Sequence, residues 1–371
     1  MNLSSKVISL IKRYDLSILA TVIAIFLIGV LNLYSALSSN PSAHMAQLYK
    51  TQIMWFSLSM LIAIVTSFIH PKNLYRFAWF IYGFNVILLL VVLLFGKMGM
   101  GAQRWIVLGP LRLQPSETMK IALVIALARW YSKVDPDKPI NFRKLIIPSI
   151  IAFIPAVLVI IQPDLGTGLL LLLVFLSITF YRQLKWKTIG IIGILAILAG
   201  TFMYNFGLKE YQRKRIITFI DPYADAKGSG YNAIQSEIAI GAGRLTGKGF
   251  KKSSQASLQY LPENHTDFVF SVYNEEHGFI GSLILISLFI ILLMRMIWIS
   301  SVVVKFFDSI IAIGVMAIFF WHTFINMGMV MGLMPIVGLP LPLMSYGGSS
   351  LLTFGVCTGV ITSVSNSRNL F

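Results

Sequence analysis

The stretch Phe279-Ile-Gly-Ser-Leu-Ile-Leu-Ile-Ser-Leu-Phe-Ile-Ile-Leu-Leu-Met294 contains no ionisable side chain, and it decides the fold class. An apolar run of about 20 residues is long enough to cross the hydrocarbon core of a membrane as one helix. The segment just before it, residues 262–278, instead carries several ionisable groups, among them Asp267, Glu275 and Glu276. Their position raises the question of which polar groups contact them at the start of an apolar helix.

The rest of the chain shares this apolar character. Of its 371 residues, 57% are hydrophobic and 12% are charged, and its mean hydropathy is +0.79. Soluble domains contain about 25% charged residues, so the composition indicates a membrane protein. Ten apolar runs are predicted as spanning helices, at roughly residues 16–36, 51–70, 77–96, 114–131, 145–161, 165–181, 188–206, 279–299, 307–330 and 344–366. We therefore predict an all-α polytopic membrane protein, a single domain over residues 1–371 with ten transmembrane helices.

Lysine and arginine are enriched in the loops on one side of these helices, which predicts the cytoplasmic side. This group comprises Lys6, Lys12, Arg13, Lys72, Arg76, Arg129, Lys133, Lys138, Arg143, Lys144, Arg182, Lys185, Lys187, Arg295, Lys305 and Arg368. The short loops of the opposite side hold only Lys50, Lys97, Arg104 and Arg112. Both termini are therefore predicted to be cytoplasmic.

Residues 208–278, between the seventh and eighth predicted helices, form one large extracytoplasmic loop. The segment carries nine lysines and arginines, but loops longer than about 60 residues escape the charge rule. Within it, Ile234, Ile238 and Leu245 recur at helical spacing. This pattern predicts an amphipathic helix over residues 232–245 that rests at the outer membrane interface.

Several classes of function are not expected from this sequence. Most of the net charge of +16 lies in the loops that set orientation, and no basic cluster lies on a soluble domain, so nucleic acid is not an expected partner. Cys357 is the only cysteine, which leaves no intrachain disulfide and no thiolate metal site. The Gly247-Lys-Gly249 stretch lacks the first glycine and the Ser/Thr of a phosphate-binding loop. The first apolar run has no obvious cleavage site and is predicted to be a retained anchor.

Ionisable residues inside or against the apolar runs are the candidate functional groups, because each costs about 2.5–3.5 kcal/mol at the centre of a spanning helix. Glu117 and Lys120 lie three residues apart, on one helix face. They form either a structural ion pair between helices or a charged wall of a cavity open to the outside. Asp164 follows Pro163 at the start of a helix and is either an N-terminal cap or a site residue.

Asp267 is the strongest candidate. It lies where the large loop re-enters the membrane, with His265 and Thr266 beside it and Glu263 four residues earlier. Partial desolvation raises the pKa of a carboxyl toward the range useful for a general base. Glu275 and Glu276 are either interface charges or members of the same site.

Six motifs, in this order along the chain, resemble the RodA/FtsW family of membrane proteins, also called the SEDS family. They are Gly101-Ala-Gln-Arg-Trp105, Gln114-Pro-Ser-Glu117 with Lys120, Gln162-Pro-Asp-Leu-Gly-Thr-Gly168, Gln235-Ser-Glu-Ile-Ala-Ile-Gly241, Leu261-Pro-Glu-Asn-His-Thr-Asp-Phe268 and Leu341-Pro-Leu-Met-Ser-Tyr-Gly-Gly-Ser-Ser350. Residues 334–342 and the short termini look more like the elongation member than the division member. The resemblance covers nearly the whole chain.

The resemblance implies a peptidoglycan glycosyltransferase with ten transmembrane helices in the cytoplasmic (inner) membrane. It would polymerise lipid II, the disaccharide-pentapeptide on undecaprenyl pyrophosphate, at the outer face during cell elongation. The essential acidic residue of the family falls on Asp267, and the charged cavity residues fall on Glu117, Lys120 and Asp164. Two departures, Ala242-Gly-Arg244 and Ser253-Ser-Gln255, put the detailed contacts of the large loop in doubt.

On this reading Asp267 is the general base, with His265 and Thr266 among the substrate-binding residues. The leaving pyrophosphate needs positive charge, which Arg104, Lys120, Arg244 or Lys248 could supply. A divalent cation, Mg²⁺ or Mn²⁺, is also expected, because carboxylates and substrate phosphates suit Mg²⁺, and Asp267 itself could hold it.

The resemblance also implies partners: a class B penicillin-binding protein with transpeptidase activity, and other membrane proteins of the elongation complex. Two other functions compete with the enzyme. A transporter that flips the lipid-linked precursor would also have many helices and buried charge, although its site should lie near the membrane midplane. A scaffold that only binds the transpeptidase is the third possibility.

Overall fold

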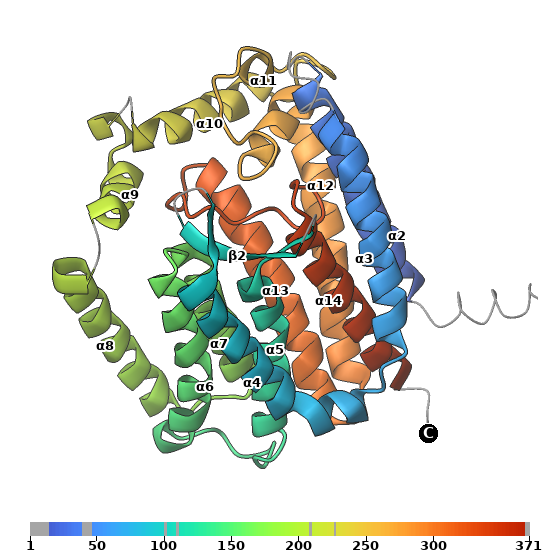
Figure 1. The fold of residues 1–371 in the computed structure, drawn as a ribbon, viewed down its shortest axis with the longest axis vertical. Coiled ribbons are helices and arrows are strands. Elements are labelled where there is room, and N and C mark those ends of the chain that lie inside the picture. The colour runs from blue at the N-terminus through green and yellow to red at the C-terminus, as the bar shows by residue number, and fades with distance from the viewer. Residues whose placement is uncertain are drawn as a thin grey trace, which may run out of the picture.

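The computed structural model describes residues 15–38, 47–99, 102–108, 111–207, 210–225 and 228–367. Gly101, the start of the large loop at residue 208, and the orientation-setting charges Lys6, Lys12, Arg13 and Arg368 lie outside these ranges. The long helices are α2 (Leu16–Leu37), α3 (Leu48–Ser67), α4 (Pro71–Phe95), α5 (Pro115–Tyr131), α6 (Phe142–Ile161), α7 (Leu165–Tyr181), α8 (Trp186–Phe202), α12 (Val269–Val302), α13 (Phe306–Val330) and α14 (Gly348–Ser367). Each of the ten predicted apolar runs therefore coincides with a helix (Figure 1).

Seven of the described helices are long and apolar enough to cross a membrane by length and composition, namely α2, α3, α4, α6, α12, α13 and α14. The helices α7 and α8 are apolar but shorter. The protein is thus a helical, multi-pass membrane protein. Its spanning helices expose apolar side chains on the outside, such as Phe80 and Phe95 of α4, as lipid-facing surfaces require.

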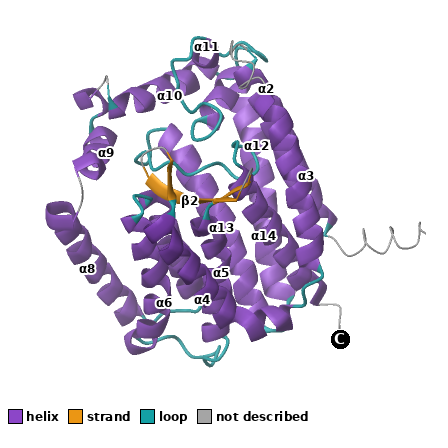
Figure 2. Ribbon diagram, viewed as in Figure 1, coloured by secondary structure: helices purple, strands orange, loops and turns teal. Residues whose placement is uncertain are grey.

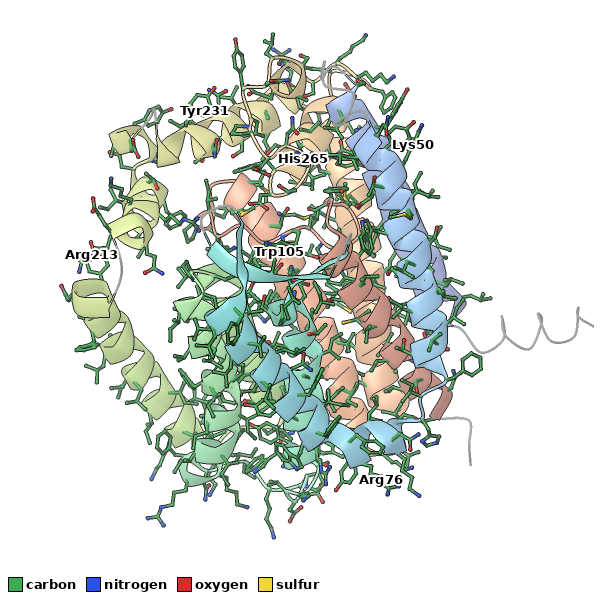
Figure 3. The ribbon with its side chains drawn as sticks, in the orientation of Figure 1. Lys50, Arg76, Trp105, Arg213, Tyr231 and His265 are labelled. Carbon is green, nitrogen blue, oxygen red and sulfur yellow. The ribbon has the colours of Figure 1, made fainter. Side chains whose placement is uncertain are left out.

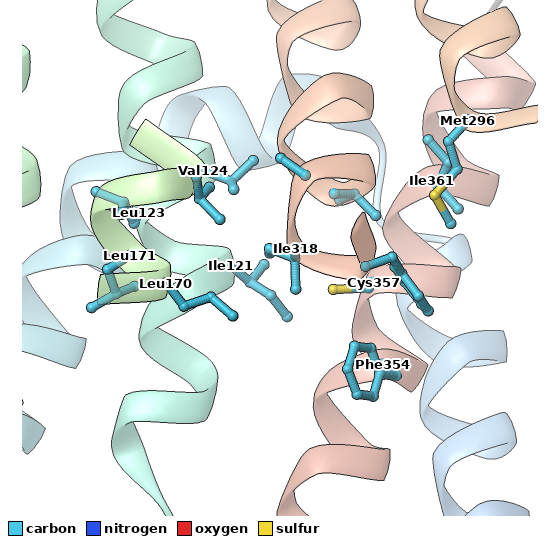
Figure 4. Close-up of a cluster of buried hydrophobic side chains, with 14 of the residues drawn as sticks. Ile121, Leu123, Val124, Leu170, Leu171, Met296, Ile318, Phe354, Cys357 and Ile361 are labelled. Carbon is cyan, nitrogen blue, oxygen red and sulfur yellow. The ribbon is translucent and has the colours of Figure 1, made fainter. Parts of the chain in front are cut away.

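The helix α5 forms the centre of the bundle. It is buried on almost all sides, including Ile121, Leu123 and Val124, and it packs against α4, α6, α7, α13 and α14. Figure 4 shows these side chains meeting Leu170 of α7, Ile318 of α13 and their neighbours on α14. A helix that is apolar all round belongs in such a core, and this position makes the charges at its outer end inaccessible.

The prediction that the chain is all-α was wrong for the segment between α4 and α5. This segment forms an antiparallel sheet of three short strands, β1 (Lys97–Gly99), β2 (Ala102–Leu108) and β3 (Leu111–Leu113), in the order β1-β2-β3 (Figure 2). Consecutive Trp105, Ile106 and Val107 favour strand because aromatic and β-branched residues pack well on a pleated surface. The sheet lies at the end of the bundle where α4 ends and α5 begins (Figure 2).

The predicted start of the eighth apolar helix at residue 279 is confirmed, because a break at Gly278 precedes it, but the helical segment before that break was not predicted. The helix α12 begins at Val269 and is broken at Gly278, whose φ of 65° and ψ of −161° are not helical. The break leaves backbone groups without helical partners, and residues 244–249 supply them. The N–H groups of residues 248 and 249 donate to the carbonyls of 275 and 276, and those of 279 and 280 donate to the carbonyls of 244 and 245.

The large loop contains α9 (Glu210–Ile220), α10 (Ser229–Gly243) and α11 (Ser254–Ser257). In Figure 1 these helices arch over one end of the bundle, while α8 stands apart from the other long helices. The predicted helix at residues 232–245 corresponds to α10 and is confirmed. Its small residues Ala233, Ser236 and Ala239 are buried, whereas Ile238 remains exposed, as does Leu245 just beyond the end of the helix, and a helix at a membrane interface would have such an exposed apolar side.

Candidate functional site

Asp267 ends a tight turn at the start of α12, and hydrogen bonds fix the backbone there. The carbonyls of residues 265, 266 and 267 each accept one bond from a different group. The donors are the Tyr346 N–H at 2.9 Å, the Ser345 hydroxyl at 2.6 Å and the Asn326 side-chain amide at 2.9 Å. Three consecutive carbonyls held in this way leave the Asp267 backbone little freedom to shift.

The carboxyl group of Asp267 is half-buried. Burial raises the pKa of Asp267 to about 6, with a further rise from the charge of Glu263 and a small one from Asp164. The positive charges of Arg215 and Arg104 oppose this rise. A carboxyl with a pKa near 6 is ionised at neutral pH and still basic enough to accept a proton.

Residues 338–346 press against this carboxyl group from the α13 side. A Cβ added at Gly338, where φ is +73°, would lie 3.2 Å from Asp267 Oδ2, so glycine allows the backbone to approach closely. Asn326, which is fully buried on α13, also donates to the carbonyl of Leu339 at 2.7 Å. One amide therefore ties α13, this loop and Asp267 together.

The structure confirms that Asp164 caps a helix. Its Oδ1 accepts a hydrogen bond from the Thr167 N–H at 3.2 Å at the start of α7. Its Oδ2 accepts one from Gln114 at 3.2 Å and lies 3.9 Å from the Arg104 guanidinium. Arg104, on β2, also donates to the carbonyls of Gln162 and Pro163. This pair influences Asp267 by its charges, so the structure brings both predicted residues near the candidate base.

Glu117 and Lys120 form the predicted ion pair, with 2.8 Å between Oε1 and Nζ. The side chain of Lys120 is fully buried and lies 2.7 Å from His322 Nε2. Since the ammonium group can only donate, Nε2 of His322 accepts and its Nδ1 donates to the Pro340 carbonyl at 3.1 Å. Of the two alternatives, this geometry favours the structural ion pair over a wall open to the outside. That these two residues bind substrate stays a prediction.

Lys248 lies in a different cluster. Its Nζ is 2.6 Å from Glu275 Oε1 and 2.8 Å from the Ser254 hydroxyl. Glu275 is fully buried and also accepts a hydrogen bond from Ser253. The nine residues from 267 to 275 are mostly helical, and the eight steps between them span about 12 Å along the axis. The structure therefore pairs Lys248 with Glu275 and does not bring it to Asp267.

His265 and Thr266 flank Asp267 and are half-buried. The Thr266 hydroxyl donates to Glu263 Oε2 at 2.9 Å, and the imidazole ring of His265 lies 6.2 Å from the Tyr346 ring, centre to centre. Burial lowers the pKa of His265, against a smaller opposing effect of Glu263. In Figure 3, His265 and Trp105 lie at the end of the bundle beneath the arch that carries Arg213 and Tyr231.

A cavity of about 250 Å³ opens between this arch and the end of α13. Its lining comes from α9, α10 and the segment that follows α13. The lining residues are Arg215, Thr218, Phe219, Pro222, Asn232, Ala233, Glu237, Met329, Gly332, Met334, Pro335 and Ile336. Ile336 is two residues from Gly338, which lies against the Asp267 carboxyl group.

The described residues contain no group of three or more His, Cys, Asp or Glu side chains that could hold a metal ion alone. Mg²⁺ is usually bound by one or two carboxylates together with substrate phosphates and water. Asp267 could therefore take part in a metal site only if substrate phosphates complete it.

The sequence analysis missed four residues that shape this site: Arg215, His322, Asn326 and Ser345. Ser345 lies within a quoted motif, and a histidine and an asparagine inside an apolar run are themselves signals of buried polar contacts. Nothing in the local sequence distinguished Arg215 from its basic neighbours.

The chain was compared with known proteins. A family model for FtsW, RodA and SpoVE, described as a cell cycle protein, matches residues 15–370. Peptidoglycan glycosyltransferase MrdB of Escherichia coli K12 is 38% identical over 356 residues, which cover 96% of this chain and 94% of that protein.

Two solved structures are similar along nearly their whole length. One, described as "Structural coordination of polymerization and crosslinking by a peptidoglycan synthase complex", contains a chain with a TM-score of 0.82 at 31% identity, covering 96% of this chain and 99% of that chain. The other, the Rod shape determining protein RodA of Thermus thermophilus, has a TM-score of 0.72 at 29% identity, covering 96% of this chain and 98% of that chain.

Proposed function

We infer the mechanism from one premise: the chain belongs to the FtsW/RodA/SpoVE family and is a peptidoglycan glycosyltransferase. We propose that Asp267 is its general base and lipid II its substrate. The observation that carries this proposal is the half-buried Asp267 carboxyl group, with its pKa raised to about 6 and its backbone held by three hydrogen bonds.

A sugar hydroxyl is a poor nucleophile until a base removes its proton. In the proposed step, Asp267 takes the proton of the acceptor hydroxyl while the acceptor oxygen bonds to the anomeric carbon of the donor. The bond from that carbon to the pyrophosphate oxygen breaks, and lipid pyrophosphate leaves with the electron pair. One displacement inverts an α-linked donor to a β-linked product, so no covalent enzyme intermediate is needed.

The departing pyrophosphate develops negative charge that cations stabilise. Arg104 is a candidate because its guanidinium is partly exposed and influences Asp267. A Mg²⁺ or Mn²⁺ ion held by Asp267 together with substrate phosphates would supply the same stabilisation. If so, chelation should remove polymerisation of lipid II by the wild-type protein, and either ion should restore it.

We also propose that all ten long helices span the inner membrane, with both termini cytoplasmic and residues 208–278 outside. The charge bias of the short loops supports this orientation. It places Asp267, which ends the large loop, at the outer face, where a membrane-anchored substrate presents its polar head. Labelling of single cysteines placed in the large loop of intact cells tests it.

A class B penicillin-binding protein and other elongation-complex membrane proteins are the proposed partners. A similar chain is part of a peptidoglycan synthase complex that coordinates polymerization and crosslinking, which supports a transpeptidase partner. Binding could order the large loop around the site. Polymerisation should therefore rise when the transpeptidase is added at fixed lipid II, and equal rates with and without it would contradict the proposal.

The test of Asp267 is polymer formation from labelled lipid II. Asp267→Asn keeps the shape of the side chain but cannot accept the proton, and loss of a general base costs about 10²- to 10⁴-fold in rate. The matched control is Asp308→Asn, because Asp308 is also buried but lies at the other end of α13, where it accepts a hydrogen bond from Ser367 at 2.9 Å.

Normal polymerisation by Asp267→Asn, with both variants folded, would refute the assignment. Polymer from the wild-type protein separates the enzyme from the two competing functions, because neither a precursor transporter nor a scaffold forms glycan.

A further inference from the structure

The cations predicted to meet the pyrophosphate are mostly engaged elsewhere in this structure. Lys120 is fully buried between Glu117 and His322. Lys248 is bonded to Glu275, and Arg104 is committed to two carbonyls and Asp164. The leaving group needs a cation whose donors are still available.

Arg215 of α9 differs from these three. Within the described residues its guanidinium makes no hydrogen bond and no ion pair, and its side chain is half-buried. It lines the cavity together with Ile336, two residues before the Gly338 that lies against Asp267, and its charge lowers the pKa of Asp267. A guanidinium presents a planar fork of N–H donors that matches phosphate oxygens two at a time.

The cavity around Arg215 has two kinds of wall. Thr218 and Asn232 line it from α9 and α10, as Arg215 does, whereas Met329 and Met334 line it from the end of α13 and the segment that follows. Methionine is flexible and adapts to irregular apolar groups. A cation next to such a wall fits a phosphate that is attached to a hydrocarbon chain. Ile336, also in the lining, is two residues before Gly338, which lies against the Asp267 carboxyl group.

We propose that Arg215 binds the pyrophosphate of the prenyl-linked substrate in this cavity and stabilises it as it leaves. This inference rests on the proposed function for the identity of the substrate. The first prenyl units would lie against Met329 and Met334, and the anomeric carbon would lie toward Asp267.

Glu237 is the one carboxylate that lines the cavity, and it opposes an anionic ligand. Its Oε1 lies over Gly332, and the residue is exposed to solvent. Water and salt screen an exposed charge more than a partly buried one, so the attraction to Arg215 dominates. Glu237→Gln should therefore leave pyrophosphate binding unchanged or strengthen it up to about threefold.

The experiment measures binding of undecaprenyl pyrophosphate, which carries no sugar, to the full chain in detergent. Arg215→Gln should weaken binding by about 10- to 100-fold, as expected for loss of hydrogen bonds to a charged group. Arg215→Lys keeps the charge but not the planar fork of donors. Its affinity should lie between those of the wild type and Arg215→Gln. The control is Lys214→Gln on the same helix, because Lys214 is exposed and pairs with Glu210 at 3.5 Å.

Wild-type affinity in both Arg215 variants would overturn the proposal. If Arg215→Gln does not fold, the affinity of Arg215→Lys decides. Wild-type affinity of that variant would show that binding does not need the two-point contact of a guanidinium group. Repeating the comparison in the Asp267→Asn protein separates the two hypotheses. Binding of the pyrophosphate should still depend on Arg215 there, whether or not Asp267 proves to be the base.

Discussion

Beside Asp267, α13 and residues 338–346 form what we call the bonded wall, whereas α9 and α10, together with the segment that follows α13, line a cavity. In the bonded wall, Asn326 and His322 lie four residues apart on α13 and donate to the carbonyls of Leu339 and Pro340. In the cavity, Arg215 makes no side-chain hydrogen bond to another described residue. A site that must hold its base still and also admit a substrate needs both kinds of surface.

The difference has an energetic basis. Satisfied polar groups in a low-dielectric interior strengthen one another and favour a single arrangement. A network of this kind runs from Pro340 of the bonded wall through His322 to Lys120 and Glu117 of α5, and within the described residues Glu117 Oε2 and Asn326 Oδ1 are its unpaired atoms. An unbonded guanidinium beside a cavity retains its capacity for a ligand. The predictions below perturb first the bonded wall and then the balance between the two sides.

The largest effect is expected at the α5 end of this network, at Lys120. Lys120→Ala leaves the buried Glu117 carboxylate without its cation, which costs about 3–5 kcal/mol. The unfolding temperature in detergent should fall sharply, together with the yield of folded protein. The double variant Lys120→Met, Glu117→Gln removes both charges and should recover most of the loss, because replacing a buried pair costs far less than breaking it. A wild-type unfolding temperature in Lys120→Ala would contradict this.

Local sequence patterns predicted the features that depend on residues a few positions away in the sequence. The ten apolar runs, the Asp164 cap and the Glu117–Lys120 contact rest on helical spacing and end effects within a few residues. The helical segment before Gly278, from Val269, was missed for the opposite reason. Glu275 and Glu276 look like the polar end of a loop, but both are buried within α12 by partners from other segments.

The bonded wall depends on contacts that no local pattern contains. Asn326 and Asp267 are 59 residues apart in sequence, and Lys120 and His322 are 202 apart. The assignment of Lys248 as a cation near Asp267 has the same difficulty, since its partner Glu275 lies 27 residues away. The family motifs marked some of these residues without indicating which of them meet.

A smaller effect, on rate more than on stability, is expected from two matched asparagines. Asn326 and Asn32 are both buried, and each donates from Nδ2 to a backbone carbonyl at 2.9 Å, that of Asp267 or that of Val269. Asn32→Leu removes one hydrogen bond to a buried carbonyl and Asn326→Leu removes two, since Asn326 also donates to Leu339, and each carbonyl left unpaired costs about 1–3 kcal/mol. Asn326→Leu should also reduce kcat by about 10- to 100-fold, since a shift of about 1 Å in a catalytic group costs about 10²-fold.

The measurement is kcat at saturating lipid II together with the unfolding temperature of each variant. Asn32→Leu should keep kcat within about threefold of wild type while it loses stability. Equal losses of kcat in the two variants would mean that Asn326 only stabilises the fold and does not position Asp267.

The smallest effect is a pH dependence set by the balance of charges around Asp267. Its pKa is raised to about 6, and a base works only when ionised, so the rate should rise from pH 5 to 7 and then level off. At pH 5 the rate should be about tenfold below the plateau, because one pH unit below its pKa only about a tenth of a carboxyl group is ionised.

The charges of Glu263 and Arg215 should shift this rising limb of the pH–rate profile in opposite directions. Glu263→Gln removes a charge that raises the pKa and should move the limb to lower pH, whereas Arg215→Gln removes one that lowers it and should move the limb to higher pH. Initial rates of polymerisation across this range test both, and a limb that stays in place in both variants would show that another group limits the reaction.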